Sequence, residues 1–309
     1  MMRRVLVIGG PTAAGKTATS LELGKLIPCE IICADARQLY RRLDIGTAKP
    51  TADERARIPH RLFDILEPHE TINAAEYAQR ARSAIKETSI TTLPMLVGGS
   101  GLYISATLDG LSPVITDVDE SIREKLQLEL HQRGRDELYD ELRRVDPTAA
   151  ELYSDKNPRR ITRALEVFRA TGKPISEFWK LPPEAPPYEA IYIGITCERD
   201  ELKRRIDDRC EAMWNDGFLE EVAQLLASGV KPSAQSMQSV GYRQAAEVVL
   251  GERSLDDAME RLKVMTWQYA KRQLTWFTRD LRYAWLASDP QSNARTIWSM
   301  LRERNWIDD

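Results

Sequence analysis

A glycine-rich loop near the start of the chain is the first stretch whose residue types indicate chemistry. Residues 9–18 read GGPTAAGKTA and match the pattern G-x-x-x-x-G-K-[ST], in which small residues let backbone N–H groups surround a phosphate. The lysine supplies a positive charge, and the hydroxyl that follows it is a ligand for Mg²⁺. We therefore expect Thr17 to bind Mg²⁺ and a polyphosphate to lie against the whole loop, which consists of Gly10, Pro11, Thr12, Ala13, Ala14, Gly15, Lys16 and Thr17.

A carboxylate closes the second apolar stretch, CEIICAD at residues 29–35. Ligands of open parallel sheets lie beyond the carboxyl ends of the strands, so Asp35 should face the same cleft as Lys16. There it either accepts a proton as a general base or caps the segment that follows. Gln38 carries an amide suited to reading a base edge, and Arg37 either pairs with a phosphate or lies in solvent.

The later glycine turn, LPMLVGGSGLY at residues 93–103, carries no acid. A kinase or ATPase usually has a carboxylate at a later strand end, where it holds Mg²⁺ or activates water. Its absence argues against hydrolysis of a triphosphate. A second backbone turn that faces an anion, with Ser100 as hydrogen-bond donor, is the more natural interpretation.

The elements that position these residues alternate between strand and helix, which predicts an α/β fold with an open, mostly parallel sheet and a P-loop NTPase-like core. Residues 119 to about 172 are rich in charge and have a helical pattern, and a proline-rich connector follows at 180–190. We expect a catalytic core of 1–115 and 188–309 and a helical insertion at 116–187. Within the core we predict strands at 60–66 and 283–287, a helix that Asn73 caps, and one long helix over 197–222.

Composition sets limits on the protein's class and surroundings. The 309 residues are 42% hydrophobic and 29% charged, with a net charge of −3, so any nucleic-acid contact depends on local basic patches. No apolar stretch approaches the roughly 20 residues that span a bilayer, which excludes a membrane protein. Four cysteines without a CxxC pair indicate reduced core residues, no zinc and a cytoplasmic location. No spare apolar stripe is evident, and we expect a monomer.

Two basic segments stand out in this acidic chain. Residues 156–173 carry six Lys or Arg and one acid, and residues 263–282 carry five and one, with interleaved aromatics. Arginines neutralise phosphates, and aromatic side chains stack on exposed bases. A solvated helix face with its aromatic residues in the core produces the same pattern. For the aromatic residues we favour this second interpretation, a place in the core. On the predicted helix at 197–222, Arg205 and Arg209 lie four residues apart and share one face, as lid arginines over a phosphate would.

Taken together, these segments resemble the tRNA dimethylallyltransferase (tRNA isopentenyltransferase) family of bacterial type, without the zinc finger of some eukaryotic members. The matching stretches occur in family order and cover most of the chain; they are GPTAAGKT, ADARQLYRRLDIGTAKP, IPHRLFDI, LVGGSGLY, NPRRITRALEVF with TGKP, GFLEEV, VGYRQ and YAKRQLTWF.

The resemblance implies transfer of a dimethylallyl group from dimethylallyl diphosphate to N6 of the adenine beside the anticodon, position 37, in tRNAs that read codons beginning with U. It makes Asp35 the general base, places the diphosphate on Thr12–Thr17, and makes Arg209 the lid arginine, with Arg205 as the alternative. Ala36 replaces the family's usual serine, and Ser100, counted with the catalytic residues, replaces its usual threonine. The implied tRNA contacts are Asp35, Ala36, Arg37, Gln38, Ser100, Arg123, Arg159, Arg160, Ile161, Thr162 and Arg163, the last five on the anticodon stem-loop.

Two other functions use the same loop. One is a nucleotide or small-molecule kinase, which tight ATP binding with phosphate transfer would reveal. The other is a non-catalytic RNA-binding module, against which Asp35 argues, because binding alone needs no general base.

Overall fold

Within the described residues the sheet has six strands and every pair is parallel, which confirms the predicted open α/β sheet and exceeds the mostly parallel arrangement expected. The structure, a computed structural model, describes residues 2–111, 119–180, 186 and 188–307. The strand order is β3-β2-β4-β1-β5-β6, and every neighbouring pair is parallel. The strands are β1 (Arg3–Gly9), β2 (Cys29–Cys33), β3 (His60–Arg61), β4 (Leu93–Gly98), β5 (Tyr188–Thr196) and β6 (Tyr283–Ala287).

The chain divides into two compact units. The first, here called the core unit, comprises Met1–Leu108 and Pro187–Asp309; the second, here called the helical unit, comprises Asp109–Pro186. The predicted boundary at residues 115 and 116 and most of the proline-rich connector lie outside the described residues. In the core unit the helices are α1 (Lys16–Leu23), α2 (Ala52–Arg57), α3 (Ala74–Glu87), α4 (Gly101–Leu108), α9 (Arg199–Asn215), α10 (Phe218–Ala227), α11 (Tyr242–Val249), α12 (Leu255–Thr278) and α13 (Pro290–Glu303).

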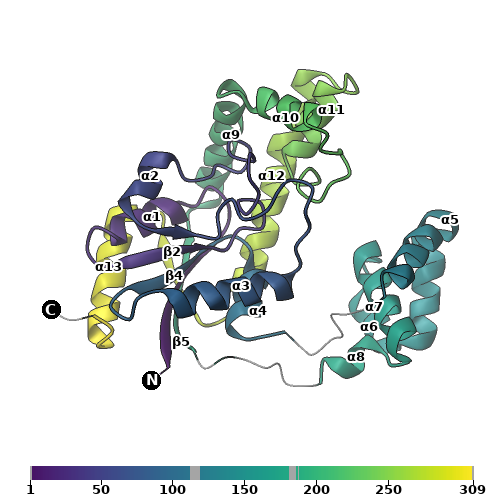
Figure 1. Ribbon diagram of the computed structural model, residues 1–309, viewed down its shortest axis with the longest axis horizontal. Coiled ribbons are helices and arrows are strands. Elements are labelled where there is room, and N and C mark those ends of the chain that lie inside the picture. The colour runs from purple at the N-terminus through teal and green to yellow at the C-terminus, as the bar shows by residue number, and fades with distance from the viewer. Residues whose placement is uncertain (1, 112–118, 181–185, 187, 308–309) are drawn as a thin grey trace. The chain divides into compact units, whose positions relative to one another are not determined.

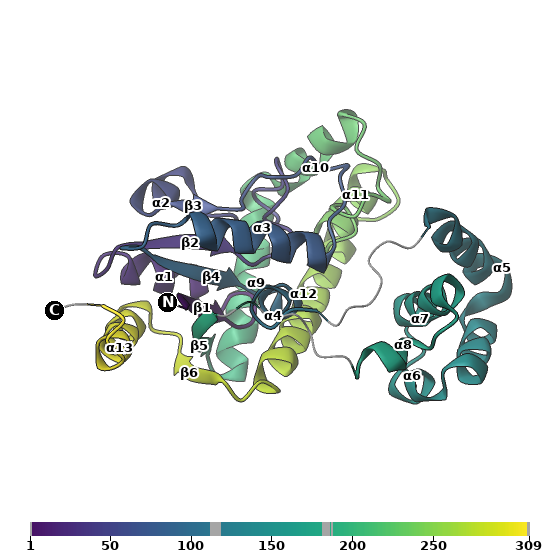
Figure 2. The same cartoon turned by 60° about the horizontal axis from the view of Figure 1, so that its bottom comes forward.

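Helices of the core unit cover both faces of its sheet. α1 and α13 pack together on one face, whereas α3 and α4 pack on the other (Figure 1). Figure 2 shows α3 and α1 on opposite sides of the strands. The central strands are buried, as expected of a parallel sheet with two covered faces. Gly9 of β1 aligns with Gly98 of β4 and with Gly194 of β5, so three small residues lie side by side near the carboxyl edge.

Three local predictions can be compared with these elements. Asn73 caps α3, as predicted, and accepts hydrogen bonds from the Ala75 and Glu76 amides. The predicted strand at 60–66 is wrong beyond Arg61, because Leu62 and Asp64 adopt left-handed φ values of 63° and 55° that end the extended run. The single helix predicted over 197–222 is wrong as well.

Gly217 divides that segment into α9 and α10. It is the N-cap of α10 with φ 95°, a conformation that favours glycine and interrupts a helix. The break gives α10 its own amino end, which presents Glu221 to a neighbouring loop. The four cysteines are free thiols, three of them buried, and none of the described helices is long and apolar enough to cross a membrane.

The helical unit forms its own hydrophobic core, with Leu138, Leu142, Ile161 and Leu165 fully buried. Within its described residues every regular element is a helix: α5 (Glu120–Val145), α6 (Pro147–Leu152), α7 (Pro158–Thr171) and α8 (Ile175–Phe178). α5 bends at Gly134, where φ is 79°.

Candidate active site

The phosphate loop connects β1 to α1 and needs both of its pattern glycines. Gly10 has φ 140°, and a Cβ there would lie 2.3 Å from the Ile195 carbonyl oxygen. Gly15 has φ 92° and is the N-cap of α1, so the loop turns its amides toward the helix end, where the dipole favours an anion. The Lys16 ammonium group donates to the Pro11 carbonyl at 2.7 Å, within the loop itself.

Asp35 and Ser100 lie at the carboxyl ends of two adjacent strands, β2 and β4. The Asp35 Oδ1 accepts from the Arg37 amide at 2.9 Å, so the carboxylate orients the turn that follows β2. The Ser100 hydroxyl accepts from the Ala36 amide at 3.0 Å, and the Ser100 amide donates to the Ala34 carbonyl at 3.0 Å. Ser100 thus connects the two strand ends, a positioning role that its hydroxyl fills without a ligand.

A cavity of about 430 Å³ unites the principal predicted residues of the core unit. Lys16 and Thr17 line it together with Asp35 and Gln38. Arg209 of α9 completes the wall. The residues that line the cavity do not include all of the predicted ones of the core unit; those absent are Gly10, Pro11, Ala14, Ala36, Arg37 and Ser100.

Of the two α9 arginines predicted to lie over a phosphate, Arg205 and Arg209, Arg209 is the one that reaches the phosphate loop. Its Nη1 donates to the Thr12 hydroxyl at 3.1 Å, and its Nη2 donates to the Thr47 carbonyl at 3.3 Å. Arg205 instead pairs with Glu201 at 2.6 Å and donates to the Ser288 hydroxyl. The geometry therefore places the Arg209 guanidinium, and not that of Arg205, against Thr12 of the phosphate loop.

Burial makes the cationic groups of this cavity electrostatically unusual. Desolvation lowers the pKa of Lys16 to about 8; the Asp35 carboxylate opposes this shift, and Arg209 adds to it. Desolvation also lowers the pKa of Arg209, again against the attraction of Asp35. Two cations and one carboxylate thus share a poorly hydrated space, and an anion that enters would restore the stabilisation that burial removed.

Comparisons with known proteins identify the family of the chain. The family model described as IPP transferase matches residues 38–280. A tRNA dimethylallyltransferase of Geobacter sulfurreducens is 42% identical over 285 residues, which cover 92% of this chain and 91% of the relative. The chain belongs to the IPP transferase family.

Solved members of the IPP transferase family share the fold. The crystal structure of the full-length tRNA isopentenylpyrophosphate transferase of Bacillus halodurans is 35% identical, covers 98% of both chains and gives a TM-score of 0.72. A eukaryotic dimethylallyltransferase acting on tRNA is 26% identical, with a TM-score of 0.79 over 98% of this chain and 80% of that one. The resemblance found in the sequence is thereby confirmed.

Thr17 is suited to a divalent cation that arrives with its substrate. Its side chain lines the cavity, and within the described ranges its hydroxyl makes no hydrogen bond. The described residues contain no group of three or more His, Cys, Asp or Glu placed for a metal ion. Mg²⁺ prefers oxygen ligands and retains several waters, so the Thr17 hydroxyl together with diphosphate oxygens fits what such an ion needs.

Gln273 of α12 is a site residue that the motifs did not identify. Its side chain is only 5% exposed. Its Oε1 accepts from the Thr12 amide and its Nε2 donates to the Gly99 carbonyl, both at 2.9 Å. One amide thus connects the phosphate loop to the second glycine turn, and a Cβ on Gly99 would lie 2.1 Å from that Nε2. The only sequence signal was its position in YAKRQLTWF, which carries no recognisable ligand spacing.

Arg37 and Gln38 are held by neighbouring backbone groups. The Gln38 Nε2 donates to the Thr47 and Ala48 carbonyls at 3.0 and 3.1 Å. The Arg37 guanidinium donates to the Gln235 carbonyl at 2.7 Å. Gln38 nevertheless lines the cavity, whereas Arg37 is committed to a separate loop.

The predicted RNA-contact residues of the helical unit divide into exposed and buried ones. Arg159 and Arg160 are exposed at the amino end of α7, where Asp155 lies 3.6 Å from Arg160. Ile161 is fully buried and Thr162 is 7% exposed. Neither side chain is therefore open to an RNA in this structure, and contact through the backbone of these two residues stays a prediction.

Two further arginines of this set converge on one carboxylate. Arg123 lies 3.0 Å from Glu166, and Arg163 lies 2.9 Å from the same oxygen. Glu166 is itself buried. Two guanidinium groups thus contact one buried carboxylate in the helical unit.

The aromatic residues of α12 also differ from one another. Phe277 is fully buried, as expected for a core residue, whereas Trp276 is 47% exposed. The preference for a core role is therefore correct for Phe277 and wrong for Trp276.

Proposed function

We propose that this protein transfers a dimethylallyl group from dimethylallyl diphosphate to N6 of the adenine at position 37, 3′ to the anticodon, in tRNAs that read codons beginning with U. The products are N6-isopentenyladenosine and diphosphate. The observation that carries the proposal is the cavity in which Lys16, Arg209 and Asp35 meet. The family supports it, since relatives at about 40% identity are tRNA dimethylallyltransferases.

The reaction needs a stabilised leaving group and a base. Lys16 and Arg209 offset the charge that develops on the diphosphate as the allylic C–O bond breaks. Mg²⁺, when bound, supplies further charge stabilisation to that diphosphate. The lone pair of the adenine N6 is delocalised into the ring, so the amine gains from losing a proton as its C–N bond forms. Asp35 is positioned beside the phosphate loop to accept that proton.

The helical unit has the chemistry to bind the anticodon stem-loop. Arg159 and Arg160 are exposed cations at a helix amino end, and Arg123 and Arg163, which both pair with Glu166, are the other two arginines that we propose as phosphate contacts. Such groups bind phosphates without reading sequence. The target adenine must leave its stack to enter a cavity of this size.

Mass spectrometry of tRNA nucleosides tests the proposal. After incubation with unmodified tRNA, dimethylallyl diphosphate and Mg²⁺, we expect N6-isopentenyladenosine at position 37. Asp35→Asn, which keeps the shape but not the basicity of the side chain, should lower kcat by about 10²–10⁴-fold. Phosphate transfer from ATP without any prenylated nucleoside would instead identify a kinase and refute the proposal.

A further inference from the structure

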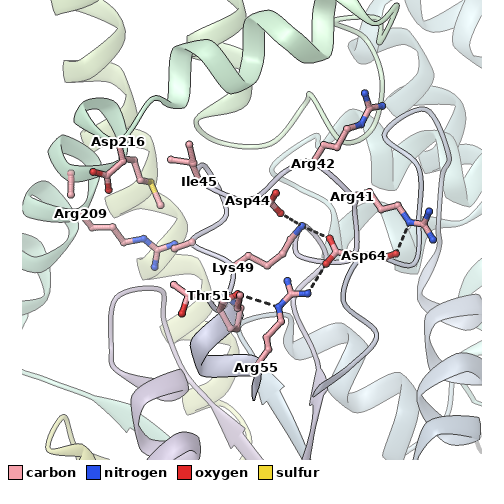
Figure 3. Close-up of a pocket in the computed structure, with 15 residues that line it drawn as sticks. Arg41, Arg42, Asp44, Ile45, Lys49, Thr51, Arg55, Asp64, Arg209 and Asp216 are labelled. Carbon is pink, nitrogen blue, oxygen red and sulfur yellow. Dashed lines mark hydrogen bonds and ion pairs between the residues drawn. The ribbon is translucent and has the colours of Figure 1, made fainter. Parts of the chain in front are cut away.

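A short loop, residues 44–49, sets the position of two side chains in the donor cavity. The Thr47 carbonyl accepts from the Arg209 guanidinium at 3.3 Å and from the Gln38 amide at 3.0 Å. The loop also borders a second cavity, of about 810 Å³, which Figure 3 shows with Arg209 on one wall. Ala48 and Lys49 line both cavities. Movement of this loop would therefore displace the arginine that faces the diphosphate.

Lys49 holds the carboxyl end of the loop. Its ammonium group is buried and donates to Asp44 and Asp64 at 2.6 Å and to the Tyr40 carbonyl at 2.7 Å. Figure 3 shows the Lys49 ammonium group between the two carboxylates, with Arg55 below it and paired with the same Asp64. All three ammonium protons are thus used inside the protein, which makes Lys49 a structural cation and not a free anion ligand.

Glu221 of α10 holds the amino end of the loop. Its Oε2 accepts from the Asp44 and Ile45 amides at 2.9 and 2.8 Å. Its Oε1 lies 3.4 Å from the Gly46 amide and accepts from the Tyr242 hydroxyl. Three successive backbone amides around one carboxylate form an anion-binding nest, so this contact fixes backbone direction and not merely side-chain packing.

The loop has little freedom to adjust on its own. A Cβ on Gly46 would lie 2.2 Å from the Phe218 ring and 2.6 Å from the Tyr242 ring. Ala48 has φ 46°, a left-handed conformation that costs free energy for a residue with a side chain. Such a conformation persists only while its surroundings hold it, and Glu221 supplies part of that restraint.

We infer that Glu221 is a positioning residue for the donor cavity and acts through the 44–49 loop on Arg209. Glu221 does not itself line that cavity, so we expect it to act on an anion through the loop, whose Thr47 carbonyl accepts from Arg209. The inference rests on the proposed function only in taking a diphosphate as the ligand of Lys16 and Arg209. It assigns a role to GFLEEV, whose contribution to the site the sequence left open.

A double-mutant cycle with inorganic diphosphate and Mg²⁺ tests this coupling by isothermal titration calorimetry. We expect Glu221→Ala and Arg209→Ala each to weaken diphosphate binding by about tenfold, the size of one charge-assisted hydrogen bond. The double variant should bind at most about twofold more weakly than Arg209→Ala alone, because both changes remove the same contact. Full additivity of the two losses, or unchanged affinity in Glu221→Ala, would overturn the inference.

Glu220→Ala is the matched control, since Glu220 is an exposed neighbour of Glu221 in the first turn of the same helix. It should leave diphosphate affinity unchanged. Glu221→Gln retains one acceptor oxygen for the Asp44 and Ile45 amides, and should restore most of the affinity lost with alanine. If Glu221→Ala unfolds at the assay temperature, Glu221→Gln replaces it in the double-mutant cycle. We then expect a smaller loss of diphosphate affinity, and no such loss when Arg209→Ala is already present.

The assay separates this inference from the proposed function. Diphosphate binding needs neither tRNA nor a prenyl group. Coupled binding without prenylated tRNA would refute the proposed transfer reaction and support the role of Glu221. Prenylated tRNA together with additive losses of diphosphate affinity would support the transfer reaction and refute the role of Glu221.

Discussion

Replacement of Gln273 by leucine should destabilise the protein and loosen the phosphate loop together. The change removes two hydrogen bonds of 2.9 Å and leaves the Thr12 amide and the Gly99 carbonyl without a partner. A buried polar group left unpaired costs about 1–3 kcal/mol. Because Thr12 borders the cavity, water can recover part of one of these losses. We therefore expect a loss of about 2–4 kcal/mol in the free energy of unfolding, a large fraction of a typical domain's stability.

Urea denaturation followed by circular dichroism measures this loss. Gln268→Leu, an exposed glutamine on the same helix, is the control and should change the unfolding free energy by less than about 0.5 kcal/mol. Gln273→Glu keeps an acceptor for the Thr12 amide but cannot donate to Gly99. It also adds a buried negative charge beside the phosphate loop, which repels an anion, so diphosphate affinity should fall below that of the wild type. Wild-type stability in Gln273→Leu would show that the bridge is dispensable and refute this reasoning.

Three further predictions concern pH, packing and RNA. Burial lowers the pKa of Lys16 to about 8, so diphosphate affinity should fall between about pH 7 and pH 9 in the wild type but not in Lys16→Met. Over the same range the free protein should gain stability, because the lysine of the unfolded chain still binds a proton that the folded protein has lost. Gly46→Ala should lower Tm by several degrees, because its Cβ would overlap the Phe218 ring. Arg159→Ala should weaken tRNA binding and reduce the slope of log affinity against log salt by about one, with unchanged diphosphate affinity in calorimetry.

The sequence predicted the parts of the site whose chemistry is local. The phosphate loop is a continuous motif with a strand before it and a helix after it, and Asp35 ends the next buried strand. These relations involve neighbours along the chain and a rule about strand ends, so no tertiary contact was needed to find them.

Gln273 and Glu221 could not be found in this way. Each is an ordinary polar residue on an amphipathic helix, and its partners are backbone amides and carbonyls far away in the sequence. Backbone groups carry no residue signature, so no spacing pattern marks these contacts. The same limit explains the shortened β3: Asp64 turns out of the extended run at a left-handed φ and pairs with Lys49, a tertiary pair that overrides local strand propensity.

The Thr12–Gln273 hydrogen bond joins residues that are 261 positions apart. At a synthesis rate of about 5–20 residues per second, the phosphate loop emerges tens of seconds before the residue that fixes it. The Thr12–Gln273 bond cannot form before residue 273 has been synthesised, so a growing chain lacks this support of the phosphate loop. A contact between residues so far apart also predicts slow refolding. Diphosphate binding should therefore recover later than the helical circular dichroism signal.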